Sequence, residues 1–140
     1  RLDSIQAAVL GVKLKHLNEY NAARFAAASY YNEAFKGNDR IITPAQSASS
    51  THVFHQYTLK LNGVNRTELI KHLNDKGIPA MIYYPVCLHL QKAYQDTRYK
   101  AGDFPVAEKL SECVISLPMH TELTEEQLKH ITTSVLEFVG

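Results

Sequence analysis

The residues best suited to chemistry in this chain of 140 amino acids lie close together, between residues 78 and 91. We expect a strand over 78–84 that Pro85 terminates, followed by a loop. Because loops at the ends of strands commonly carry functional groups, this segment is the first candidate for a binding site. Its polar members are two adjacent tyrosines, a histidine and a glutamine: Tyr83, Tyr84, His89 and Gln91.

The two tyrosines also have a plainer interpretation. Successive side chains of a strand face opposite sides, so a regular strand buries at most one of Tyr83 and Tyr84 in the core. A tyrosine at the rim of a sheet packs its ring against apolar neighbours and leaves its hydroxyl in water. From residue types alone, a rim role and a binding role both stay open.

Other chemistry-bearing residues do not combine into a site. His52 and His55 lie three residues apart on an expected strand, which places them on opposite faces, so we expect no metal. The two cysteines lack zinc-ligand spacing, and free thiols fit a cytoplasmic protein. The sequence lacks a nucleophile elbow, a phosphate-binding glycine loop and a catalytic carboxylate pair. The guanidinium of Arg1 could hold an anion, although a solvated terminal arginine is the plainer interpretation.

Composition indicates one globular domain, with 45% hydrophobic and 21% charged residues. The net charge of +1 gives no electrostatic case for nucleic acid or an acidic membrane surface. No apolar run reaches the roughly 18 residues that a membrane span needs. We therefore expect neither nucleic acid nor a membrane as a partner.

One unusually long helix is predicted for residues 1–36. This stretch has no proline and a single glycine, Gly11, and its apolar residues recur at helical spacing. No start signal precedes it, and Gly37 supplies the stop. At about 1.5 Å per residue it would reach roughly 50 Å, which a small domain cannot cover. We therefore expect residues 1–37 to connect this chain to a larger protein.

Residues 38–140 predict a two-layer α/β domain of about three strands with helices packed on one face. A polar loop over 38–51 comes first. Capping-box spacing marks the starts of two helices, and Pro105 fits the first turn of a third. The capping pairs are Asn65 with Glu68 and Thr124 with Gln127, and the expected strands cover 53–61, 78–84 and 114–117.

Five segments, in this order, resemble the DegT/StrS family of sugar aminotransferases. The resemblance spans essentially the whole chain, and five ordered segments are more specific than any one of them. They are Arg-Leu-Asp-Ser-Ile-Gln-Ala-Ala (1–8), His-Val-Phe-His-Gln-Tyr (52–57), Tyr-Tyr-Pro-Val-Cys-Leu-His-Leu-Gln-Lys-Ala-Tyr (83–94), Gly-Asp-Phe-Pro-Val-Ala-Glu (102–108) and Ser-Leu-Pro-Met-His (116–120).

The resemblance implies the aspartate aminotransferase fold, with 38–140 as its C-terminal small domain and 1–37 as the interdomain helix. Family members use pyridoxal 5′-phosphate (PLP) to move an amino group, usually from glutamate, to a keto group of a nucleotide-linked sugar. Since a large N-terminal domain would hold most cofactor ligands, we expect the isolated chain to be inactive. The resemblance further implies a cytoplasmic homodimer that serves cell-surface polysaccharide biosynthesis.

The resemblance also implies substrate-binding roles, and no catalytic ones, for residues of this chain. Arg1 matches an arginine that reaches the neighbouring subunit's site. Tyr83 and Tyr84 match a frequent His-Tyr pair that contacts the sugar nucleotide across the dimer, and the change from imidazole at Tyr83 makes Tyr84 the stronger candidate. His89 and Gln91 match a segment near the substrate entrance.

Two alternatives to the enzyme remain open. One is a protein of the same fold that acts as a sensor or regulator without catalysis. A lysine able to bind PLP in the intact protein would distinguish the enzyme from it. The other is a stand-alone binding module of ferredoxin-like character, which predicts a monomer with a protected first helix. If the first helix is exposed instead, we expect the chain to cover it by self-association.

Overall fold

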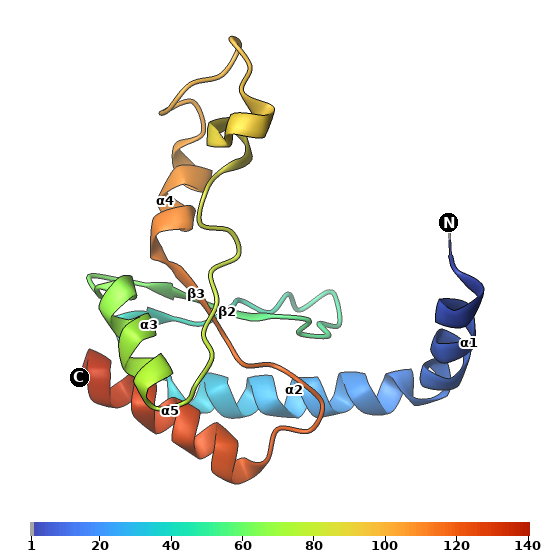
Figure 1. The fold of residues 1–140 in the computed structure, drawn as a ribbon. Helices are drawn as coiled ribbons and strands as arrows, with labels where there is room; N and C mark the ends of the chain where they lie inside the picture. Colours follow the sequence, from blue (N-terminus) through green and yellow to red (C-terminus); the bar gives the residue numbers. More distant parts are fainter. Residues whose placement is uncertain (1) are drawn as a thin grey trace.

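The computed structural model describes residues 2–140 and shows a three-stranded sheet with helices (Figure 1). Within residues 2–140, none of the helices has the length and apolar character to cross a bilayer. The helical elements are α1 (Ser4–Lys13), η1 (Leu14–His16), α2 (Leu17–Ala34), α3 (Arg66–Asp75), η2 (Leu88–Leu90), η3 (Lys92–Tyr94), α4 (Pro105–Cys113) and α5 (Glu125–Val139). The strands are β1 (Ile41–Ile42), β2 (Tyr57–Leu61) and β3 (Val114–Leu117).

The core lies between one face of the sheet and the apolar faces of α2, α3 and α5. In β2, Tyr57, Leu59 and Leu61 are buried while Lys60 is exposed, which confirms the predicted alternation. Tyr31 of α2 packs against Tyr57, with ring centroids 4.8 Å apart. The α/β class and the small-domain architecture are therefore as predicted.

The sheet has the order β1-β2-β3 and both pairs are antiparallel. One predicted strand is wrong: over 78–84 only Met81 pairs, as an isolated bridge to Ser116. Pro79 has no N–H to donate, which stops the ladder from extending toward the start of this segment. The third strand is instead β1, which lies in the stretch predicted as a loop and pairs Ile41 with Leu61.

The predicted single helix over 1–36 is also wrong, because η1 interrupts it and α1 turns away from α2 (Figure 1). Its start does carry a signal: the side chain of Asp3 accepts a hydrogen bond from Ile5 N at 2.8 Å. The expected exposure of apolar side chains is confirmed. The exposed apolar residues of this region are Leu2, Ile5, Val9, Leu10, Val12, Leu14 and Leu17.

Two predicted helix starts form as their sequences indicate. Thr124 and Gln127 make both bonds of a capping box at α5, and the Asn65 side chain accepts from Glu68 N at α3.

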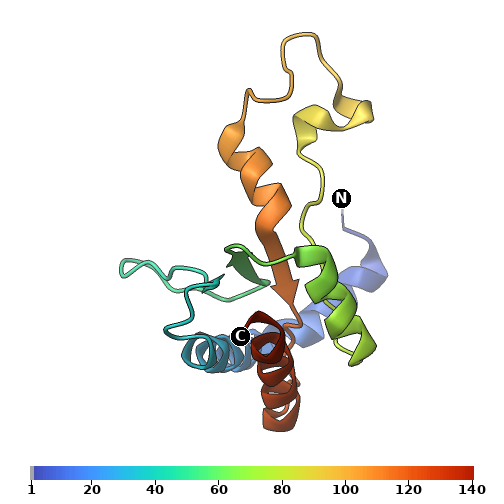
Figure 2. The same ribbon diagram turned by 90° about the vertical axis from the view of Figure 1, so that its left-hand side faces the viewer.

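Between the sheet and α4, residues 83–104 form an arm that contains η2 and η3. Figures 1 and 2 show this arm projecting away from the sheet alongside α4. The arm contains most of the residues to which the sequence assigned binding.

Candidate functional site

A hollow of about 470 Å³ lies between the base of the arm and α4. Tyr84, Leu88 and Gln91 line it from the arm. Opposite them, Ala107, Leu110 and Ser111 line it from α4. Since a helix places residues three and four apart on one face, α4 presents these three side chains as one wall.

The hollow is largely apolar with a few polar groups at its edges. Tyr83 and Tyr84 meet edge to face, with ring centroids 5.8 Å apart, and Tyr84 is 72% exposed. Neither tyrosine is buried in the core, and Tyr83 is also partly exposed. Gln91 Nε2 donates to Val86 O at 3.1 Å, and within residues 2–140 its side-chain carbonyl oxygen accepts no hydrogen bond. Uncharged hydroxyl and amide groups of this kind suit the hydroxyls of a sugar.

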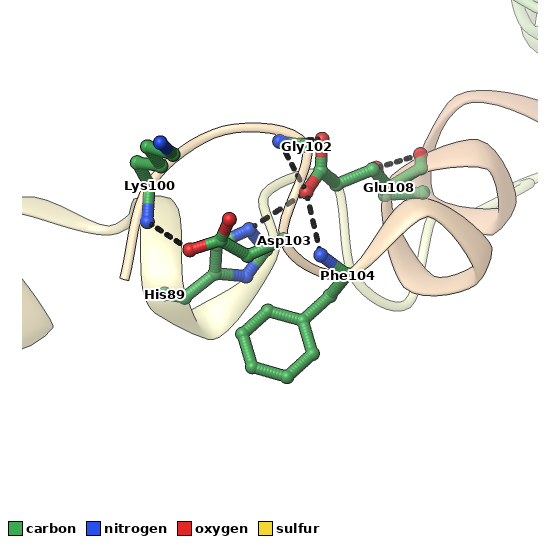
Figure 3. A network of polar contacts seen from close by, with 7 residues as sticks. His89, Lys100, Gly102, Asp103, Phe104 and Glu108 are labelled. Atoms are coloured by element: carbon green, nitrogen blue, oxygen red, sulfur yellow. Dashed lines mark hydrogen bonds and ion pairs between the residues drawn. The ribbon is translucent and has the colours of Figure 1, made fainter. Parts of the chain in front are cut away.

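His89 does not line this hollow, although it lies between Leu88 and Gln91 in the arm. Its Nε2 lies 3.0 Å from Oε1 of Glu108, and its ring centroid lies 4.8 Å from that of Phe104. The side chain of His89 is 9% exposed. The structure therefore places His89 in a contact between the arm and α4 (Figure 3).

Glu108 accepts several hydrogen bonds at the start of α4. Gly102 N donates to both carboxylate oxygens at 3.0 Å, and Phe104 N donates to Oε1 at 3.2 Å (Figure 3). The Gly102 amide, with Phe104 N and His89 adding to it, holds the pKa of Glu108 below its ordinary value of 4.5. Sequence reasoning missed this residue because its partners lie up to 19 residues away.

The Glu108 contacts should weaken only when the pH falls below the ordinary glutamate pKa of 4.5. Because the folded pKa is below the unfolded one, the stabilisation is fully present above the unfolded value and is lost as pH falls through the folded value. In protein labelled with ¹⁵N-glycine, the Gly102 amide shift should therefore titrate with a midpoint below 4.5. A midpoint at or above 4.5 would contradict the observed bonding. Gly63 serves as an internal control, since its backbone is not bonded to a carboxylate here.

A second hollow of about 300 Å³ also has Tyr83 in its lining. His55 and His120 contribute to its lining together with Gln56 and Met81. Tyr83 lines both hollows, so the two adjoin at this residue. Sequence reasoning did not bring His55 and His120 together, because they approach only through the pairing of β2 with β3.

The predicted site residues thus separate into three groups. Tyr83, Tyr84 and Gln91 line the hollow, whereas His89 contacts Glu108. Arg1 lies outside the described residues.

Within residues 2–140, no group of three or more His, Cys, Asp or Glu side chains could hold a metal ion. Cys87 and Cys113 are free thiols, and Cys87 lines the hollow.

The chain matches one protein family over nearly its whole length. The family model described as "DegT/DnrJ/EryC1/StrS aminotransferase family" matches residues 1–136. A pleiotropic regulatory protein of Geobacillus stearothermophilus is 40% identical over 140 residues, which are 99% of this chain and 37% of that protein. A UDP-N-acetyl-3-dehydro-alpha-D-glucosamine 3-aminotransferase of Acidithiobacillus ferrooxidans is 41% identical over 96% of this chain and 35% of its own length.

A solved structure extends the similarity to the fold. The crystal structure of S. venezuelae DesV superimposes with a TM-score of 0.93 at 34% sequence identity. The match covers 99% of this chain and 37% of that chain. This chain therefore spans little more than a third of the length of the proteins that it matches.

Proposed function

Because the chain belongs to the DegT/DnrJ/EryC1/StrS aminotransferase family, we propose that the protein containing it aminates a keto group of a nucleotide-linked sugar. The observation that carries this proposal is the hollow beside Tyr84 and Gln91, whose uncharged polar groups suit sugar hydroxyls. The name of the Acidithiobacillus relative, a UDP-sugar 3-aminotransferase, supports the substrate class.

The family is PLP-dependent, and PLP supplies the electron sink for amino transfer. None of the described residues that line the hollow is a lysine, so the hollow does not fit the covalent site of this cofactor. We therefore propose that PLP is held mainly by an N-terminal domain, with residues 38–140 as the C-terminal small domain and 1–37 as the connecting segment. On this proposal, the chain by itself is inactive and binds part of the sugar nucleotide.

We further propose a homodimer in the cytoplasm, with glutamate as the amino donor and a product used in cell-surface polysaccharide biosynthesis. Exposed apolar side chains on the arm, among them Tyr84, Val86 and Leu88, support a partner surface there. For Arg1, Tyr83, Tyr84 and Gln91 we propose substrate contact. His89 would act through Glu108, since it contacts that carboxylate and is not among the residues described as lining the hollow.

Amino transfer by the full-length protein tests the proposal. The protein would be supplied with PLP, glutamate and the UDP-linked 3-dehydro sugar named for the Acidithiobacillus relative. Mass spectrometry should show an amino sugar nucleotide and an equal amount of 2-oxoglutarate. If neither product forms with any UDP- or dTDP-linked keto sugar, the proposed enzyme activity is rejected. The chain supplied alone should give no product.

A second candidate function is regulation. The name of the Geobacillus relative, a pleiotropic regulatory protein, is the observation that favours it. A regulator of this fold would bind the sugar nucleotide without consuming it. Isothermal titration that shows binding, together with an absence of amino transfer, would favour the regulator over the enzyme.

Replacing Tyr84 with phenylalanine should weaken sugar-nucleotide binding by about 1 kcal/mol, or roughly fivefold in KM, because one neutral hydrogen bond is lost. Steady-state kinetics of the full-length protein would measure this change. Tyr94→Phe is a matched control, since Tyr94 is also exposed on the arm and is not among the residues described as lining the hollow. An unchanged KM in Tyr84→Phe would remove this residue from the site.

A further inference from the structure

Glu108 joins two segments of the chain that the hollow depends on. Its carboxylate accepts from His89 in η2 and from Gly102 and Phe104 just before α4 (Figure 3). Phe104 is the N-cap of α4 but offers no side-chain acceptor. Glu108 accepts from the N–H of this N-cap residue, as the glutamate of a capping box does, and its charge favours the helix N-terminus.

The positions of this contact along the chain connect it to the hollow. His89 lies between Leu88 and Gln91, which line the arm side. Glu108 lies between Ala107 and Leu110, which line the α4 side. The bond between His89 and Glu108 therefore joins the two walls from behind, and neither of its side chains enters the space that they enclose.

Aromatic packing adds to this contact between the arm and α4. The Phe104 ring lies between His89 and Tyr99, with centroid distances of 4.8 and 5.5 Å. Gly102 has a φ of +93°, a conformation that residues with a Cβ rarely adopt, and this turn aims its N–H at both carboxylate oxygens. The turn at Gly102, the packing of the Phe104 ring and the Glu108 carboxylate therefore hold the arm against α4 together.

We propose that Glu108 is a positioning residue for sugar binding, because it fixes the separation of the arm from α4 and with it the width of the hollow. This inference rests on the proposed function. It assigns no contact between Glu108 and substrate. It predicts that loss of the carboxylate affects how well the sugar is held more than how fast the amino group is transferred.

The test compares Glu108→Gln with Glu112→Gln in the full-length protein with PLP and the UDP-linked 3-dehydro sugar. Glutamine keeps the size but has one accepting oxygen and no charge, so it loses one of the two bonds from Gly102 N and the charge assistance of the remaining bonds. Glu112 lies on the same helix and is exposed. We expect KM for the sugar to rise about tenfold in Glu108→Gln with kcat within about twofold, and both constants unchanged in Glu112→Gln.

Hydrogen exchange gives a second measurement that needs no catalysis. Peptides over the arm should exchange faster in Glu108→Gln, while those of β2 and β3 should keep their protection. If Glu108→Gln does not fold, His89→Phe keeps the ring packing, removes the nitrogen and should raise KM in the same direction. An unchanged KM, or a lowered kcat at unchanged KM, would overturn the inference. Wild-type protein without amino transfer would instead reject the proposed function.

Discussion

Replacing Tyr31 with alanine is expected to lower the free energy for opening the core by about 3–5 kcal/mol. Tyr31 and Tyr57 are fully buried and in ring contact between α2 and the sheet. Truncation would leave a cavity and remove the bond that the Tyr31 hydroxyl donates to Pro118 O at 2.9 Å. Burial raises the pKa of Tyr31 and of Tyr57, so both hydroxyls stay protonated and neutral through the physiological range.

Native-state hydrogen exchange at the amides of Leu59 and Ile115 measures this loss, because both buried residues pair in the same two strands as Tyr57. Tyr31→Phe is the matched control. It keeps the ring and removes only the hydroxyl, so it should cost about 1–3 kcal/mol through the unsatisfied Pro118 carbonyl. Equal losses for the two variants would show that the ring itself contributes little to the core.

Replacing Ala107 with tryptophan is expected to lower kcat/KM for the sugar nucleotide by about 100-fold. Ala107 is a small residue on the α4 wall, opposite Tyr84 and Gln91. An indole at this position would occupy much of the hollow of about 470 Å³. The exposed position means that the larger side chain displaces ligand and not the core.

Glu112→Trp controls for the introduction of a large aromatic side chain on the same helix. Glu112 is exposed, and it is not among the residues described as lining the hollow. Its kcat/KM should stay near that of the unmodified protein. A similar loss in both variants would indicate general damage to α4, and no loss in Ala107→Trp would place the sugar elsewhere.

Local sequence signals predicted much of the fold. Alternation gave the buried face of β2, and a capping box placed the start of α5 at Thr124. β3 was predicted with its observed bounds, 114–117, because Pro118 ends it. These signals succeed since a turn, a cap or a proline acts on its immediate neighbours.

The errors arose where distant contacts decide the structure. The two residues of β1 are too short to show a period, and they form a strand only because Leu61 and Lys60 lie opposite them. The segment over 78–84 has the apolar character of a strand, yet it contributes only Met81. At the N-terminus, we did not predict the capping role of Asp3 from the sequence. The residues of η1 include no proline or glycine that would predict the interruption of the helix.

The candidate site was predicted in part. The sequence identified the polar residues of the arm, and the structure brings Tyr83, Tyr84 and Gln91 to one hollow. It did not identify the opposite wall on α4, because Ala107 and Ser111 have no chemical signature of their own. The same limit applies to Glu108, whose role depends on His89 across 19 residues.

We propose that the hollow beside Tyr84 holds the sugar of the nucleotide-linked substrate. A crystal structure of the full-length protein with PLP and the amino sugar nucleotide tests it most directly. We expect the sugar between the arm and α4, with one of its hydroxyls within hydrogen-bond distance of the Tyr84 hydroxyl. A sugar bound away from both Tyr84 and the α4 wall would contradict the account.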